Sequence, residues 1–151
     1  MALLLAPRPL EARRAPTRPG PIEVREMGGR APAATEALRA TMREQVAHHI
    51  HALADARLLT SPQGYVVDGS IDNLQIAERP DGLEVTCGVR LILSARRSGA
   101  MLAMTSGEAS VRARRGQKPA ARERLVNEVL DGAVRAASDE LLLHFQARRK
   151  S

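Results

Sequence analysis

Histidines and a single cysteine are the side chains of this sequence best suited to metal binding or nucleophilic chemistry. His48, His49 and His51 fall in one predicted helix, and His144 is the fourth histidine. Zinc sites on a helix use ligands four residues apart and a third ligand from elsewhere. Here only His48 and His51 share a side of the helix, and neither a carboxylate nor a second cysteine completes a set. We therefore predict no metal site.

The remaining reactive side chains also indicate no catalytic site. Cys87 stands at an apolar position of an alternating run, which predicts that it fills the core. Asp68, Asp72 and Glu84 are expected opposite arginines on a strand face, where such carboxylates usually form solvated ion pairs. The sequence contains no Gly-x-Ser-x-Gly, no Cys-x-x-Cys and no glycine-rich nucleotide loop. We predict a protein that is not an enzyme and that binds no cofactor.

The elements that would position these side chains centre on Gly64 to Arg115, which predicts three consecutive antiparallel strands. Apolar residues occupy the odd positions from Leu83 to Ala95 and largely again from Met101 to Ala113. That period of two indicates strands with one buried face. A three-residue loop at 97–99, with its glycine in the left-handed conformation, would set Ala95 opposite Met101.

The first predicted hairpin turns at Arg79–Gly82, where proline and glycine favour a tight turn. Pairing back from this turn sets Ile76 opposite Val85, but the apolar parity then changes at Ile71. We predict a β-bulge near residues 72–73, which would restore Ile71 opposite Val89.

Two long amphipathic helices are predicted, at Ala34–Ala56 with Thr35 as N-cap and at Ala120–Gln146 after Pro119. Ile22–Glu26 is a candidate short edge strand, followed by a turn at 28–30. The predicted fold is therefore α+β, a three-stranded antiparallel meander covered on one face by two long helices. With the candidate fourth strand at the edge, the order is (β)-α-β-β-β-α.

The 151 residues, with a net charge of +6, suffice for one domain. We expect a disordered Pro/Arg-rich leader at 1–20, a single domain at 21–147 and a basic tail at 148–151. The apolar start of the leader is too short to cross a membrane and lacks the basic region of a signal peptide. The compartment stays open: periplasmic if a signal peptide lies upstream, otherwise cytoplasmic.

Two surfaces are candidate binding sites. The outer face of the sheet gathers apolar side chains, which can mark a partner surface, at Val66, Ile92, Leu102 and Met104. The amino-terminal segment could instead cover them, or they could be exposed aliphatics without a role.

The stretch from 96 to 124 holds eight basic and two acidic residues. Nucleic acid would be contacted there by Arg112, Arg114, Arg115, Lys118, Arg122 and Arg124. Part of this arginine content could instead reflect a GC-rich genome.

The order helix, three strands, helix is that of double-stranded-RNA-binding domains, and Lys118–Arg122 resembles their basic helix start. The strands here are longer, however, and the double-lysine motif of that family is absent.

A second resemblance covers about Ile22 to Phe145. Tyr65–Ile71, Val85–Leu93 and Ser98–Leu102 resemble a strand, strand and turn pattern of bacterial envelope proteins. The pattern is similar to the curli-secretion lipoprotein, the lipoprotein activators of penicillin-binding proteins and the TolB amino-terminal domain, although the lipid-attachment cysteine is missing. The resemblance implies a non-catalytic accessory module that binds another envelope protein. An exposed sheet edge could accept a partner strand or join copies of this chain, and nucleic-acid binding is the alternative function.

Overall fold

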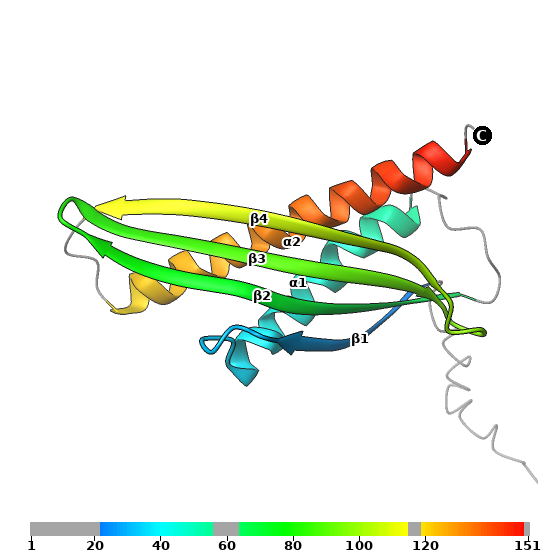
Figure 1. The fold of residues 1–151 in the computed structure, drawn as a ribbon, viewed down its shortest axis with the longest axis horizontal. Helices are drawn as coiled ribbons and strands as arrows, with labels where there is room; N and C mark the ends of the chain where they lie inside the picture. Colours follow the sequence, from blue (N-terminus) through cyan, green and yellow to red (C-terminus); the bar gives the residue numbers. More distant parts are fainter. Residues whose placement is uncertain (1–21, 56–63, 115–118, 150–151) are drawn as a thin grey trace, which may run out of the picture.

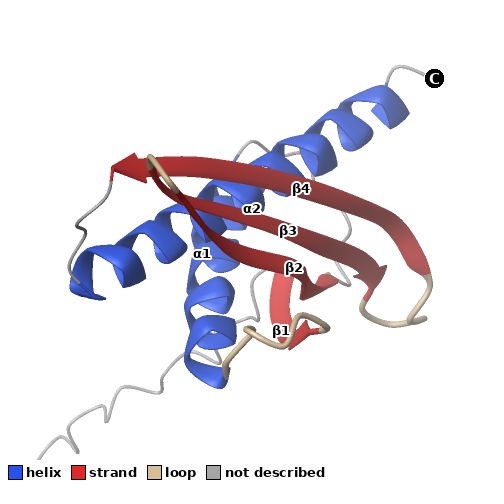
Figure 2. Ribbon diagram, turned by 60° about the vertical axis from the view of Figure 1, so that its left-hand side comes forward, coloured by secondary structure: helices blue, strands red, loops and turns tan. Residues whose placement is uncertain are grey.

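The computed structural model describes residues 22–55, 64–114 and 119–149. Along the chain the elements are β1 (Ile22–Gly29), α1 (Glu36–Asp55), β2 (Tyr65–Arg79), β3 (Gly82–Ala95), β4 (Met101–Arg114) and α2 (Pro119–Arg149). The strands form one sheet in the order β1-β2-β3-β4, and both helices lie on one face of it (Figures 1 and 2). We call the helix-covered side the inner face and the other side the outer face. The predicted α+β fold and element order are confirmed.

The register of β2 on β3 is the predicted one. Ile76 pairs with Val85 and Ile71 with Val89, and the register shifts between Ile71 and Asn73. The predicted bulge therefore exists, because without it the apolar side chains on either side of Asp72 would face opposite sides of the sheet.

The edge strand β1 is longer than predicted and runs parallel to β2. Its pairing extends from Ile22 opposite Tyr65 to Gly29 opposite Ile71, so 28–29 belongs to the strand and not to a turn. A Cβ atom at Gly29 would lie 2.5 Å from the Cβ of Ala34. Glycine is therefore needed because the chain folds back over the strand on its way into α1.

The tip of the β3–β4 hairpin corrects the predicted loop. Ser94, not Ala95, pairs with Met101, and the register shifts before Leu93 pairs with Ala103. The turn is closed by a hydrogen bond from the Ala95 amide to the Ala100 carbonyl, 2.9 Å. The extra residue in β4 turns Met101 to the outer face, on the same side as Ser94. Gly99 has the predicted positive φ, 70°.

The core lies between the inner face and the helices. Odd-numbered β3 side chains from Val85 to Leu93 are at most 2% exposed, as the alternation predicts. Thr35 caps α1, since its Oγ1 accepts a hydrogen bond from the Leu38 amide at 3.2 Å. The helices contribute buried apolar side chains at Leu38, Met42, Val46, Ile50, Val129, Leu130, Ala133, Val134, Ala137 and Leu141.

Small residues let α2 approach β4 closely. A Cβ at Gly107 would lie 2.5 Å from the Ala137 backbone nitrogen, and one at Gly132 would lie 3.2 Å from the Cβ of Ala109. The Thr105 hydroxyl donates a buried hydrogen bond to the Ala137 carbonyl, 2.8 Å. Gly132, which weakens a helix by itself, is thus placed where the helix meets the sheet.

Candidate functional site

The histidines are not brought together as a ligand set. His49 Nε2 lies 3.0 Å from Asp131 Oδ1, so this side chain joins α1 to α2. The rings of His48 and His49 meet edge to face with centroids 5.5 Å apart, while His51 is exposed. Within residues 22–55, 64–114 and 119–149, no three metal-binding side chains converge. His49 therefore has a structural role between the helices.

Cys87 lies in the core, fully buried. Burial raises the pKa of its thiol from 9.0 to about 11, because the thiolate is poorly solvated there. A thiol that keeps its proton at neutral pH is neither a nucleophile nor a ready metal ligand. The chemistry of this position is therefore that of a small apolar side chain.

The carboxylates of the outer face are held in polar contacts. Asp72 Oδ2 lies 2.9 Å from Arg90 Nη2, and its Oδ1 accepts a hydrogen bond from Ser70 Oγ at 2.7 Å. Glu84 Oε2 lies 2.7 Å from Arg79 Nε and 3.7 Å from Arg112. The Asp72 and Glu84 carboxylates are therefore both held in ion pairs with neighbouring arginines.

The apolar surface predicted on the outer face is rearranged at the hairpin tip. Val66 is only 3% exposed, and nearby the Arg96–Glu23 ion pair at 3.6 Å joins β1 to the loop that follows β3. Leu102 is half-buried and packs against the core, whereas Met104 is 56% exposed beside Ile92.

Met101 takes the place predicted for Leu102, with 63% of its surface exposed. The sequence pattern missed it because a three-residue loop would have turned this side chain inward. We call Ile92, Met101 and Met104 the hairpin patch.

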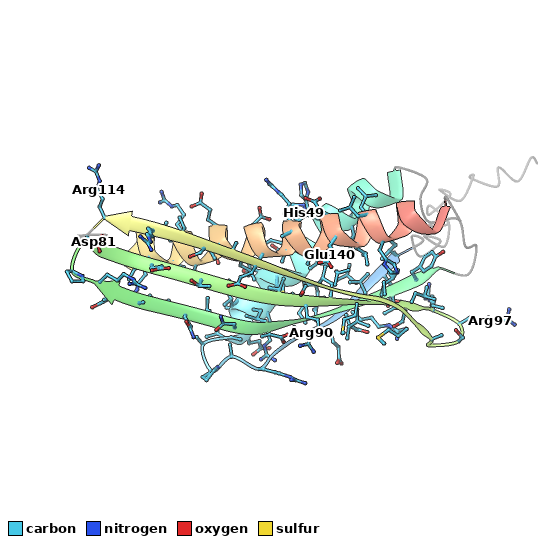
Figure 3. All side chains as sticks on the ribbon, turned by 45° about the horizontal axis from the view of Figure 1, so that its top comes forward. His49, Asp81, Arg90, Arg97, Arg114 and Glu140 are labelled. Carbon is cyan, nitrogen blue, oxygen red and sulfur yellow. The ribbon has the colours of Figure 1, made fainter. Side chains whose placement is uncertain are left out.

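The predicted basic residues do not form one continuous surface. Arg112 and Arg114 lie at the end of β4, and Arg114 is at the opposite end of the sheet from Arg97 (Figure 3). Arg122 Nη2 lies 3.5 Å from Glu78 Oε1, and Arg124 is exposed. The other two residues of the prediction, 115 and 118, lie outside the described part of the chain.

The sequence predicted an exposed sheet edge without indicating which strand provides it, and the structure shows such an edge on β2. The Arg30 and Ala31 amides both donate to the Ile71 carbonyl, at 3.1 and 3.3 Å, and there β1 ends. Beyond this point, from Asp72 to Arg79, no described strand pairs with that side of β2. We call these eight residues the open edge.

A groove of about 420 Å³ lies on the inner face beside the open edge. The starts of α1 and α2 form its walls, and Leu74 and Ile76 of β2 contribute to its lining. Ile76 is 38% exposed. The other lining residues are Ala33, Thr35, Ala37, Leu38, Thr41, Arg122, Glu123, Val126 and Asn127. The groove is thus apolar inside, with charged and polar side chains from α2 around it.

Comparison with known proteins shows the fold. No protein-family model matches the sequence, and no curated protein is significantly similar to it. A candidate lipoprotein from Caulobacter crescentus is 19% identical, with 91% of this chain and 98% of that chain aligned at a TM-score of 0.55. A Xanthomonas campestris protein of the domain family DUF330 is 10% identical, with coverage of 86% and 88% and a TM-score of 0.53.

The fold is therefore one that also occurs in a bacterial protein described as a lipoprotein. No specific family is shown at these identities. The described helices include none that is long and apolar enough to span a membrane.

Proposed function

We propose that this protein is a non-catalytic accessory module of the bacterial cell envelope that binds another protein by accepting an extended strand along the open edge. The observation that carries the proposal is the coincidence of the open edge with the apolar groove beneath it. The likeness to a bacterial protein described as a lipoprotein supports the envelope setting.

The open edge offers both the affinity and the selectivity of strand addition. Its eight residues extend about 25 Å and present backbone groups with which no described strand pairs, the template on which an added strand binds. Alternate side chains of that strand would point over the groove, where Leu74 and Ile76 provide apolar contacts. Gln75 and Ala77, on the outer face of the open edge, are uncharged and therefore neither attract nor repel charged side chains of the incoming strand. The expected ligand is an extended segment with apolar residues at every second position.

Peptides selected from a displayed random library test this proposal, with affinity measured by fluorescence anisotropy. We expect the selected peptides to alternate apolar and polar residues and to slow hydrogen exchange of amides in the open edge. Ile76→Glu should weaken binding at least about tenfold, because a carboxylate would be buried under the added strand. Met104→Ser, at the other end of the molecule, is the matched control and should bind like the parent protein.

Two results would contradict strand addition: selected peptides that ignore Ile76→Glu, or protection confined to residues outside 72–79. A second copy of this chain is an alternative source of the strand. Self-association measured by light scattering, and lost in Ile76→Glu, would identify the partner as another copy.

A further inference from the structure

Exposed apolar side chains lie toward the end of the molecule opposite the open edge, with Met101 and Met104 on the outer face of the sheet and Leu143 on the helix that covers the inner face. Of the four large apolar side chains exposed in the described residues, three lie toward this end: Met101, Met104 and Leu143 at 63%, 56% and 64%. The first two stand at the start of β4, and Leu143 lies near the end of α2. The β3–β4 loop and the end of α2 reach the same end of the molecule in both ribbon views (Figures 1 and 2).

Positive charge accompanies these apolar side chains. The β3–β4 loop carries Arg96 and Arg97 in succession, and Arg96 is paired with Glu23 at 3.6 Å. Arg97 forms no ion pair in the part of the chain that the structure describes, and its side chain projects beyond the sheet (Figure 3). A surface that contacted the loop would therefore meet the Arg97 guanidinium group near the exposed Met101 and Met104 side chains.

We propose that the hairpin end docks on an anionic phospholipid bilayer. Met101 and Met104 would enter the boundary between headgroups and acyl chains, and Arg97 would lie among the lipid phosphates. Apolar burial combined with attraction to anionic lipid is the physical basis of interfacial binding. A bilayer fits these observations because exposed apolar side chains lie near an arginine that forms no ion pair in the described part of the chain, the combination that an anionic interface binds. The open edge, at the far end, stays accessible to a partner while the protein is docked.

Vesicle sedimentation with the full-length chain tests the proposal. We expect binding to phosphatidylglycerol vesicles, little binding to phosphatidylcholine vesicles, and weaker binding as salt increases. Met101→Ser combined with Met104→Ser should lower the partition coefficient at least about tenfold. Both residues are more than half exposed, so the fold should be retained, as circular dichroism would verify. Ile76→Ser removes an exposed apolar side chain from the other end and should leave vesicle binding unchanged.

Charge is tested by a matched pair of arginines at opposite ends of the sheet. Arg97→Glu should weaken binding to anionic vesicles at least about fivefold, since each charge near such a surface contributes about that factor. Arg114→Glu changes the net charge by the same amount at the far end and should have a much smaller effect. Equal effects of the two substitutions would show that net charge alone drives binding and would overturn the proposal.

A fluorophore at the loop reports the docked orientation. Cys87 is buried, so an environment-sensitive label can be attached selectively at Ser98→Cys or, as the control, at Asp81→Cys in the opposite turn. We expect a blue shift on anionic vesicles only for the label at position 98.

Absence of sedimentation with phosphatidylglycerol at low salt would overturn the proposal. Vesicle binding by the methionine and Arg97 variants that equals that of the parent protein would also overturn it. The first 21 residues, with their four arginines, remain in every variant, and the binding would then be attributed to them. In that case the hairpin patch is better explained as a contact for protein.

Discussion

At the scale of single residues, Cys87 shows how burial alone sets chemistry. The pKa of its thiol is about 11 in the folded protein and 9.0 as the ordinary value. Between these two pH values the unfolded chain has lost a proton that the folded chain keeps. Because the unfolded state binds fewer protons there, the free energy of unfolding falls as the pH rises through this window.

We therefore expect the parent protein to lose about 1 kcal/mol of stability from this group between about pH 8 and 10. Cys87→Ala removes the titrating thiol and should lack this part of the pH dependence, although it is less stable overall because of the cavity it leaves. Urea unfolding at the two pH values measures both effects. Parallel pH profiles for parent and variant would show that the thiol is not protected.

Two strand glycines that look alike in the sequence should respond differently to alanine. At Gly107 a methyl group would overlap the α2 backbone, whereas at Gly88 the nearest atom is the Asn73 Cβ at 3.5 Å. We expect Gly107→Ala to destabilise the protein by about 1–3 kcal/mol, and Gly88→Ala to stay within about 0.5 kcal/mol of the parent. Urea midpoints give the comparison. If the two variants were equally stable, α2 would not lie as close to β4 as described.

At the scale of elements, the inside and outside of the sheet are tested by a pair of substitutions. Val89 is 2% exposed in the middle of β3, so Val89→Asp buries an unpaired charge and should cost more than about 4 kcal/mol, enough to unfold the domain. Arg114→Ala, on the exposed end of β4, should change stability by less than about 0.5 kcal/mol. Thermal melts followed by circular dichroism give both values, and an aspartate variant that melts like the parent would contradict the register.

The sequence predicted correctly those strands whose alternation of apolar and polar side chains is compatible with only one register. The alternation in β3 and the parity change at Ile71 determine the first hairpin and its bulge, because any other register would bury polar residues. The β3–β4 tip was mispredicted because the predicted loop and the observed loop both leave Leu93 opposite Ala103. The choice between these two loops depends on a backbone hydrogen bond that the side-chain pattern does not encode. Met101 was missed for that reason.

The location of the open edge and the groove beside it could not be read from the sequence because they arise from long-range packing. No local turn links β1 to β2, so neither the parallel pairing nor its end at Ile71 is signalled by neighbouring residues. The groove depends equally on where the starts of α1 and α2 lie over β2. Leu74 and Ile76 fit the strand pattern as core residues, and only the fold shows that Ile76 is partly exposed.

At the scale of the whole molecule, the distribution of charge argues against nucleic acid as the main ligand. Arg112 and Arg122 each face a carboxylate, from Glu84 and Glu78 respectively. Nucleic-acid affinity depends on many phosphate contacts made together, and two of the six predicted contact residues are thus engaged in ion pairs.

We therefore expect no gel shift of duplex RNA or DNA at about 50 mM salt, where such contacts are strong. The Arg112→Ala and Arg114→Ala double variant is the matched comparison. A shift that this variant abolishes, and that weakens steeply with added salt, would instead support the basic segment as a nucleic-acid site.

The parallel attachment of β1 has a consequence for the order of folding. β2, β3 and β4 are joined by short turns, whereas β1 reaches β2 only after α1 has crossed the sheet, and closing so long a loop is entropically slow. We expect β1 to assemble late and to open first in native-state exchange. Until it docks, a newly made chain exposes the whole length of β2. A partner strand that binds before β1 docks could then pair with a longer stretch of β2 than the folded protein exposes. In that case β1 would compete with the partner for the edge of β2.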